Sequence, residues 1–328
     1  MADIDLTMRD IYSARARIAP IANKTPLVSS PALAELTGSE IYLKLENLQK
    51  TGSFKPRGAA NKLLSLDPGA LQRGVITVSS GNHGRALAYV AHRLGLRAVV
   101  CLPDTAPANK RDAIQKLGAE LVVRGSTYED AVKEAYRLID KEGLEMIHPY
   151  DDPVVIAGQG TIGLELLEEF PDLDTVVVPL SGGGLLGGIA FALKSADPKI
   201  HVVGVMMERG PAMVESLRAG RIVDIVEEPT LADALAGGIR PNQYTFDLVR
   251  KTIDETVLVS EQEIAGAMAF ALEHHHLVVE GGGAVGIAAL RAGKLQHLGK
   301  RVAVVVSGAN VDMPRLLRIA REHLDSRP

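Results

Sequence analysis

The sequence has little cysteine and few aromatic residues, and both shortages narrow what the protein can be. It contains a single cysteine, Cys101, and no tryptophan, and aromatic residues make up 4% of its 328 positions. One cysteine cannot form an intramolecular disulfide, so a secreted disulfide scaffold is excluded and a reducing cytoplasm is expected. The scarcity of aromatic side chains argues against a stacking surface for nucleotide bases.

Long apolar runs and an excess of positive charge are also missing. No stretch approaches the roughly eighteen apolar residues of a membrane-spanning helix, and residues 1–10 lack the apolar segment of a signal peptide. The net charge of −4 provides no basic surface for nucleic acid. We therefore expect a cytoplasmic protein that binds a small molecule, without a membrane or nucleic-acid partner.

What the sequence does contain, from residue 41 onward, is an alternation of two patterns. Short β-branched runs occur at Ile41–Glu46, Gly74–Ser79, Ala98–Leu102, Leu121–Val123, Thr175–Leu180, His201–Met206, Thr256–Val259 and Arg301–Val306. Helical spacing follows at Gly84–Leu94, Ala108–Leu117, Glu129–Lys141, Gly184–Lys194, Glu261–His274 and Met313–His323. This alternation predicts a mostly parallel sheet covered on both faces. Ligands of such sheets bind beyond the carboxyl ends of the strands.

The first of four glycine-bearing motifs is Gly52-Ser-Phe-Lys-Pro-Arg-Gly58. Lys55 lies in a polar turn, and Pro56 stands where a helix would start, a position that tolerates proline. The positive end of that helix would lower the pKa of the lysine amine, which suits a lysine that must be deprotonated to form a Schiff base. Spacing alone still favours a simpler interpretation, a surface lysine at a helix start.

The second motif, Ser79-Ser-Gly-Asn-His-Gly84, follows a predicted strand. Its hydroxyls, amide and backbone N–H groups at a helix N-terminus would suit a carboxylate. A plain strand-to-helix turn capped by serine or asparagine explains the same residues equally well.

The third and fourth motifs follow later strands. In Ser181-Gly-Gly-Gly-Leu-Leu-Gly-Gly188, consecutive glycines let backbone N–H groups converge, and we predict a phosphate site there. Gly187 and Gly188 would also suit close packing of a helix on a strand. In Ser307-Gly-Ala-Asn310, the serine could hydrogen-bond a ring nitrogen, although Ser-Gly is also a common turn.

Together the four motifs resemble the fold-type II pyridoxal-phosphate (PLP) enzymes, in the branch of threonine/serine dehydratases and serine racemases. The likeness runs from about Ala19 to Leu317, and Gly-Ser-Phe-Lys-Pro-Arg-Gly-Ala around Lys55 is highly specific for this branch. The resemblance implies a tryptophan synthase β-like α/β fold with two three-layer α/β/α domains and mostly parallel sheets. The large PLP-binding domain would comprise 1–72 plus 147–328, and a small mobile domain, 73–146, would close over the substrate.

The resemblance also implies catalytic and substrate-binding roles. Lys55 would carry the cofactor and then act as the base at the α-carbon of the substrate. Ser80, Asn82 and His83 would hold the substrate carboxylate. Ser80 would also supply the hydroxyl that serine racemases use on the opposite face of the α-carbon.

The cofactor itself would be held by residues from all four motifs. Phe54 would pack beside its ring, Asn82 would hydrogen-bond the phenolic oxygen of the ring, and Ser307 would face the pyridine nitrogen. The phosphate would bind backbone N–H groups of Gly182, Gly183, Gly184 and Leu185.

The chemistry that the resemblance implies is β-elimination. A neutral hydroxyl at Ser307 does not force protonation of the ring nitrogen, so prompt loss of a β-leaving group would be favoured over transamination. We therefore expect a catabolic ammonia-lyase that converts L-threonine or L-serine to a 2-oxo acid and ammonia, with racemisation through Ser80 as a side reaction. Members of the family are commonly dimers or tetramers, so a homo-oligomer is expected.

Two segments depart from most of the family. Metal-dependent relatives have an acid where this chain has Val214, near Glu208 and Ala212, so we expect no divalent-metal site. Glycines rather than proline follow Glu280, which predicts a roomier or more mobile substrate side. Both features resemble the hydroxyectoine-utilisation dehydratases, whose substrate would be a β-hydroxy amino acid with a longer side chain. The run His274–His276 points in different directions on a helix and is interpreted as a solvated helix end.

Two other classes of protein fit the sequence less well. A nicotinamide-dependent oxidoreductase would use Gly182–Gly188 as a dinucleotide loop, but the spacing is not G-x-G-x-x-G. A binding protein without activity could share the fold. The joint presence of Lys55, Asn82 and Ser307 argues against that second class.

Overall fold

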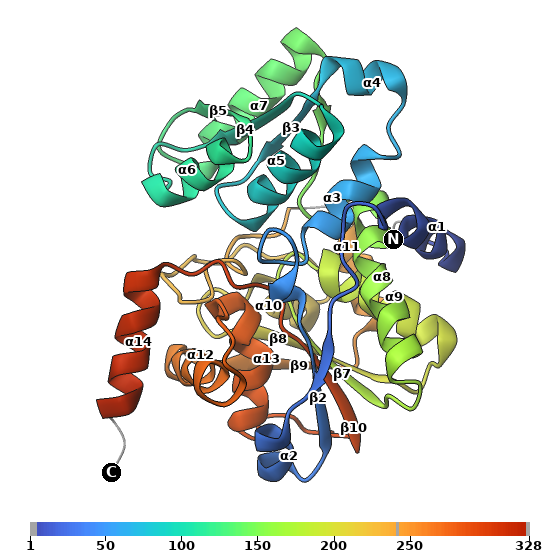
Figure 1. Cartoon of the computed structure of the whole chain (residues 1–328), viewed down its shortest axis with the longest axis vertical. Helices are drawn as coiled ribbons and strands as arrows, with labels where there is room; N and C mark the ends of the chain where they lie inside the picture. The colour runs from blue at the N-terminus through green and yellow to red at the C-terminus, as the bar shows by residue number, and fades with distance from the viewer. Residues whose placement is uncertain (1–4, 241–242, 326–328) are drawn as a thin grey trace.

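Two sheets form the framework of the computed structural model, which describes residues 5–240 and 243–325 (Figure 1). The larger sheet has the order β1 (Leu27–Ser29), β2 (Glu40–Lys44), β10 (Arg301–Val305), β7 (Thr175–Pro179), β8 (His201–Met207) and β9 (Glu255–Val259). The smaller sheet has the order β5 (Glu120–Val123), β4 (Ala98–Leu102), β3 (Val75–Val78) and β6 (Glu145–Met146). β1 pairs antiparallel with β2, and the other pairs are parallel. The predicted α/β class with mostly parallel sheets is confirmed.

The smaller sheet lies between helices on its two faces. Alternate strand residues such as Val75 and Val100 pack with α5 (Asn82–Leu94), and their neighbours Ile76 and Val99 pack with α7 (Tyr128–Glu142). Because both faces are covered, every residue of β3 and β4 is buried. A third helix, α6 (Ala108–Lys116), packs against α5 and β5.

Helices also flank the larger sheet, α8 (Pro153–Glu169) and α9 (Gly184–Ala196) on one side and α12 (Glu261–His275) and α13 (Gly281–Arg291) on the other (Figure 1). α8 and α9 approach closely at two glycines, since a Cβ on Gly188 would lie 2.8 Å from the backbone nitrogen of Gly160. The remaining elements are α1 (Met8–Ile18), α2 (Pro31–Thr37), the 3-10 helix η1 (Glu46–Leu48), α3 (Pro56–Leu63), α4 (Pro68–Arg73), α10 (Ala212–Ala219), α11 (Tyr244–Thr252) and α14 (Met313–Asp325).

The smaller sheet falls within the segment predicted as the small domain, 73–146, and its strands run from Val75 to Met146. Its apolar packing continues past that segment, because Ile18, Ala60 and Leu63 belong to the same buried cluster as the α5 face. The domain boundaries and the mobility of the small domain remain predictions. Residues 1–4, 241–242 and 326–328 of the predicted large domain lie outside the described residues.

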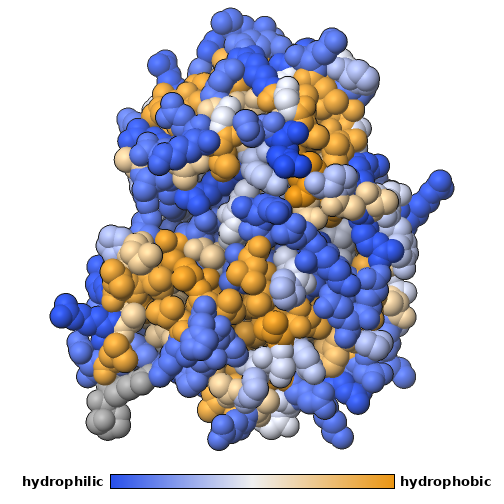
Figure 2. Space-filling model, viewed as in Figure 1, coloured by the Kyte–Doolittle hydropathy of each residue, from blue (hydrophilic) through white to orange (hydrophobic). Residues whose placement is uncertain are grey.

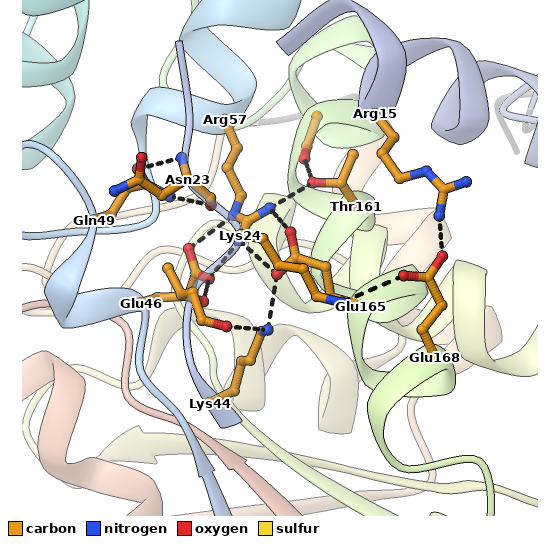
Figure 3. Close-up of polar contacts among 12 residues, drawn as sticks. Arg15, Asn23, Lys24, Lys44, Glu46, Gln49, Arg57, Thr161, Glu165 and Glu168 are labelled. Atoms are coloured by element: carbon orange, nitrogen blue, oxygen red, sulfur yellow. Dashed lines mark hydrogen bonds and ion pairs between the residues drawn. The ribbon is translucent and has the colours of Figure 1, made fainter. Parts of the chain in front are cut away.

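A cluster of four buried charges joins β2, η1, α3 and α8 (Figure 3). The Arg57 guanidinium contacts Glu46 Oε1 at 2.8 Å and Glu165 Oε1 at 2.6 Å, and Lys44 Nζ lies 2.8 Å from Glu165 Oε2. Two cations and two carboxylates balance, so no charge in this cluster is left unpaired. Because Arg57 belongs to the first turn of α3, the cluster anchors the helix that begins directly after Lys55.

Several expectations of the sequence can be checked away from the sheets. Among the described residues, no helix is both long and apolar enough to cross a bilayer. Glu208 pairs with Lys294 at 3.3 Å, and Val214 is buried in α10. In the histidine run, His275 Nε2 lies 3.0 Å from Ser30 Oγ, whereas His276 adopts a left-handed conformation at the end of α12. Separate environments of this kind agree with a helix end.

The structure gives a different reason for the glycine after Glu280 from the one expected. A Cβ on Gly281 would lie 2.1 Å from the carbonyl oxygen of Leu231. The space that a larger residue would need is therefore filled by the backbone of the 231–240 loop. The prediction that glycine makes the substrate side roomier is wrong at this residue, because glycine here permits close packing.

Candidate active site

The four glycine-bearing motifs meet at one edge of the larger sheet. β2, β10 and β7 are parallel neighbours, so the segments that follow Lys44, Val305 and Pro179 leave the sheet side by side. The turn before α3 is bonded directly to the turn after β10, since Phe54 N donates to Ser307 O at 3.1 Å and Ser53 bridges Gly308. Motifs more than 250 residues apart in the chain thus share one site.

Lys55 lies at the centre of this site. Its Nζ donates to the carbonyl oxygen of Pro149 at 2.7 Å and lies 5.0 Å from the centroid of the Phe54 ring. Burial lowers the pKa of the Lys55 amine to about 8, and the negative charge of Glu280 opposes that shift. About a tenth of the amine is therefore unprotonated at pH 7, far more than for an ordinary lysine, and this share is available as a nucleophile and base.

The acceptor of the Lys55 amine belongs to a segment that the sequence analysis missed, residues 148–152 between β6 and α8. His148 Nδ1 accepts a hydrogen bond from Asp151 N at 2.8 Å, and Asp151 Oδ1 accepts one from Thr245 N at 2.9 Å. These bonds fix the path of the segment, which passes from Lys55 to the glycine loop. The only local signal was the polar composition of the segment, since neither of the elements that flank it was predicted.

The glycine loop before α9 is shaped by that same segment. A Cβ on Gly182 would lie 2.6 Å from the Tyr150 ring, and one on Gly184 would lie 2.7 Å from the Tyr150 carbonyl oxygen. Gly183 has φ 91°, which side chains rarely adopt. The loop therefore presents bare backbone before α9, whose first N–H groups, including that of the buried Leu185, have no partner within the helix.

Ser307 is buried at the end of β10. Its backbone oxygen is used by Phe54, whereas its hydroxyl has no hydrogen-bond partner among the residues that the structure describes. Ser80, in the turn before α5, likewise has a half-buried hydroxyl without a partner in the described parts of the chain. Both hydroxyls are therefore available to a ligand.

Asn82, the first residue of α5, is tied to the larger sheet from both ends of its amide. Its Nδ2 donates to Glu280 Oε1 at 2.6 Å, and its Oδ1 accepts from Asn310 Nδ2 at 2.6 Å. Glu280 is buried, and that burial raises the pKa of its carboxyl to about 7, with the Asn82 hydrogen bond opposing the shift. The carboxyl thus titrates near neutral pH, and its charge acts on the Lys55 amine.

His83, a predicted ligand of the substrate carboxylate, uses one of its ring nitrogens within the fold. Its Nε2 lies 2.9 Å from the carbonyl oxygen of Ile147, and burial lowers the pKa of the ring to about 3. The ring is therefore neutral and donates through Nε2, which leaves Nδ1 as a lone pair, buried and unpartnered within the described residues. A lone pair repels a carboxylate, so the His83 side chain is unsuited to hold one and its backbone N–H at the start of α5 is the better donor.

These residues fit pyridoxal phosphate. The site offers an amine with a lowered pKa, an apolar ring beside it, an N–H-lined glycine loop for a phosphate, and an amide and a hydroxyl for ring atoms. The fit depends on separate observations, namely the Lys55 environment, the loop that Tyr150 covers and the free Ser307 hydroxyl.

Comparison with known proteins agrees with this fit. Residues 18–308 match the model of the pyridoxal-phosphate dependent enzyme family. An L-threonine ammonia-lyase of Thermotoga maritima is 46% identical over 97% of this chain and 79% of its own. A catabolic L-threonine dehydratase of Escherichia coli is 41% identical over 97% of both chains. The structure of maize serine racemase has a TM-score of 0.91 at 34% identity and covers 98% of both chains.

The family model spans most of the sequence and includes Lys55, the glycine loop and Ser307. Structural likeness extends over the whole fold, including both sheets. The chain belongs to the family of pyridoxal-phosphate-dependent enzymes, in its fold-type II class.

Proposed function

We propose that the protein is an ammonia-lyase that removes water and then ammonia from a β-hydroxy α-amino acid, L-threonine or L-serine, to give a 2-oxo acid. The observation that carries this proposal is the Lys55 amine, which is bonded to a backbone carbonyl and has a pKa of about 8. When bound, pyridoxal phosphate supplies an electron sink for the α-carbon. The names of the curated relatives support the choice of substrate.

Residues of the chain bind the cofactor and the substrate and move the proton. Lys55 would hold the cofactor covalently, and its free amine would take the proton from the α-carbon of the substrate. Backbone N–H groups at the start of α5, around Asn82 and His83, hold the substrate carboxylate. The glycine loop Gly182–Leu185 holds the phosphate.

Ser307 determines the fate of the substrate once the α-proton has been removed. Its hydroxyl is neutral, so it can hydrogen-bond the ring nitrogen without supplying the negative charge that would keep that nitrogen protonated. Beside a neutral Ser307 the bound cofactor would be a weaker electron sink, which would favour loss of the β-hydroxyl over reprotonation of the α-carbon. The β-hydroxyl would leave as water, and the released enamine would take up one water to give a 2-oxo acid and ammonia.

Release of 2-oxo acid from purified protein loaded with pyridoxal phosphate tests the proposal. We expect turnover of L-threonine and L-serine, and none of L-alanine, which has no β-leaving group. Formation of product only from other amino acids would overturn the substrate class. A protein that binds the cofactor but releases no 2-oxo acid from any β-hydroxy amino acid would overturn the reaction.

A hydroxyectoine-derived β-hydroxy amino acid is a second candidate substrate. A small pocket beside Glu280 is lined by charged side chains, among them Lys110, Asp233 and Arg315, which could meet the polar end of a longer side chain. The 2-oxo acid assay with ring-opened hydroxyectoine amino acids separates the candidates. Threonine turnover that is negligible beside theirs would favour this second substrate.

Serine racemase-type activity is a third candidate. The free, half-buried hydroxyl of Ser80 supports it, because racemisation needs an acid or base on the face opposite Lys55. Chiral analysis of L-serine reactions would detect D-serine. We expect Ser80→Ala to abolish D-serine formation while 2-oxo acid release persists.

The expected homo-oligomer has a candidate surface. Met313, Leu317 and Leu324 are each more than 60% exposed on α14, and an apolar area covers the region of α12 to α14 in Figure 2. We propose that a second copy of the chain covers this surface. Light scattering of the wild type and of Leu317→Glu tests it, since a dimer that persists unchanged in the variant would exclude this face.

The proposed cytoplasmic location agrees with the buried free thiol of Cys101.

A further inference from the structure

The side chain of Asn310, in the turn after β10, makes hydrogen bonds to three other residues of the site. Asn310 Nδ2 donates to Thr51 O at 2.9 Å and to Asn82 Oδ1 at 2.6 Å. Its Oδ1 accepts from Arg85 Nη1 at 2.5 Å. Asn310 therefore links the turn before Lys55 with two residues of α5, and both of its N–H hydrogens are used.

The direction of these hydrogen bonds is fixed by the two outer partners, Arg85 and the carbonyl oxygen of Thr51. An arginine guanidinium can only donate and a backbone carbonyl can only accept. Arg85 therefore requires the oxygen of the Asn310 amide on its side, and Thr51 O requires the nitrogen on the other. The amide orientation of Asn310 is thus determined by its two fixed partners.

The orientation of Asn310 in turn fixes that of Asn82. Because Asn310 presents its NH2 group, Asn82 must turn its carbonyl oxygen toward Asn310 and its own NH2 toward Glu280. One hydrogen of that NH2 is used on Glu280, and the second remains to be donated to a ligand. A flipped Asn82 would present an acceptor to an electron-rich oxygen and would place its own oxygen against Glu280.

We propose that Asn310 is a positioning residue that holds the Asn82 amide with its NH2 group toward the cofactor site. The inference rests on the proposed role of Asn82 as donor to the phenolic oxygen of pyridoxal phosphate. Asn310 does not act on the substrate, and its effect passes through Asn82. Arg85 is a second contributor, because it supplies the donor that orients the Asn310 oxygen.

Asn310→Asp tests this with almost no change in shape. An aspartate can still accept from Arg85, but it cannot donate to Asn82 or Thr51, so Asn82 loses the partner that fixes its orientation. Titration of apoprotein with pyridoxal phosphate, followed by visible absorbance, should show an altered spectrum and an affinity lower by about 10- to 100-fold, the range for a hydrogen bond to a charged group. The kcat should fall more than the KM for threonine rises.

The matched control is Asn109→Asp. Asn109 donates to Asp312 and has no hydrogen bond to Asn82 among the described residues, so it receives the same chemical change without the proposed role. We expect its cofactor spectrum and affinity to stay near those of the wild type. A loss in Asn109→Asp equal to that in Asn310→Asp would mean that added negative charge, and not amide orientation, is responsible.

A double-mutant cycle with Asn82→Ala separates positioning from a structural role. If Asn310 acts through Asn82, Asn310→Asp should cause no further loss of cofactor affinity in the Asn82→Ala background. An undiminished loss there, or a wild-type spectrum and affinity in Asn310→Asp alone, overturns the proposal. Should Asn310→Asp fail to fold, Arg85→Met can replace it, because it removes the donor that orients the Asn310 oxygen.

These measurements also separate this inference from the proposed function. Cofactor affinity and spectrum do not depend on the substrate. An Asn310 effect in a protein that does not act on threonine would leave the inference standing and overturn the substrate. A wild type that acts on threonine, together with an Asn310→Asp variant that keeps its cofactor affinity and spectrum, would support the substrate and overturn the inference.

Discussion

Lys55 and Arg57 are cations two residues apart at the start of one helix, yet their surroundings are opposite. Burial opposes the charge of Arg57, but Glu46 and Glu165 outweigh it and raise the pKa of the guanidinium above its ordinary value. Burial also opposes the charge of Lys55, whose hydrogen bond goes to a carbonyl, and its pKa falls to about 8. The partner, and not the burial, separates a cation that holds the fold from one that can lose its proton.

Removal of the Lys55 amine should produce the largest effect on activity. We expect Lys55→Ala to lose at least the roughly 10²- to 10⁴-fold that a general base contributes, together with covalent attachment of the cofactor. Borohydride reduction followed by mass spectrometry checks the attachment. Lys50→Ala, an exposed lysine of the same turn, is the control and should behave as wild type. Attachment to another lysine in Lys55→Ala would show that the site was assigned to the wrong residue.

Removal of the neighbouring cation should affect stability instead. Arg57→Met leaves Glu46 and Glu165 with only Lys44 to balance them, and breaking a buried pair in this way costs about 3–5 kcal/mol in the free energy of unfolding. Denaturant unfolding measures it. The control is Arg97→Met, whose ion pairs with Glu120 and Glu142 are exposed, so that its loss should stay below about 1 kcal/mol. Equal losses in the two variants would contradict the contrast.

The neutral His83 should make stability depend on pH. Its folded pKa of about 3 lies below the ordinary 6.5, so the unfolded chain binds a proton that the folded chain does not. Stability from this group is present above pH 6.5 and is lost as the pH falls toward 3, on the order of 2 kcal/mol by pH 5. His83→Gln should lack this component in unfolding measured at pH 7 and pH 5. His92→Gln, on the exposed face of the same helix, should keep it.

Removal of one charge near Lys55 should cause the smallest change. The negative charge of Glu280 raises the Lys55 pKa, so Glu280→Gln should lower it below about 8. The rate at which apoprotein takes up pyridoxal phosphate should rise with pH as the amine deprotonates, and its midpoint should move to lower pH in the variant. Glu208→Gln, a distant exposed carboxylate, is the control. An upward shift in Glu280→Gln would reverse the assigned sign.

The sequence predicted the parts of this fold that local pattern determines. Each of the eight β-branched runs overlaps a strand, because two-residue periodicity and β-branching act over a few residues. β1 and β6 were not predicted, since they have three and two residues and depend on pairing with neighbours.

The long helix α8 was missed for a different reason. It is buried on most sides, so it lacks the polar face that reveals a surface helix. Its glycines also weaken a helical prediction, although tertiary contact explains them. A Cβ on Gly158, for example, would lie 2.7 Å from Arg57 O.

The candidate site was predictable where a motif follows a strand. The glycine-bearing turns mark where Lys55, Asn82, the glycine loop and Ser307 lie, and the family resemblance supplies the role predicted for each. The contribution of Pro149 O and the links among Asn310, Asn82 and Glu280 join segments far apart in the chain, so no local pattern reports them. The tautomer of His83 depends on Ile147 O in the same way.

The group that holds the Lys55 amine is a main-chain carbonyl, and the loop offered to the phosphate consists of main-chain N–H groups. Substitution changes side chains and leaves these atoms in place as long as the backbone keeps its path. Substitutions can therefore accumulate in the turns that face the substrate without weakening the binding of the cofactor. A site built in this way is evolvable, because side chains around it can change while the backbone groups offered to the cofactor stay in place.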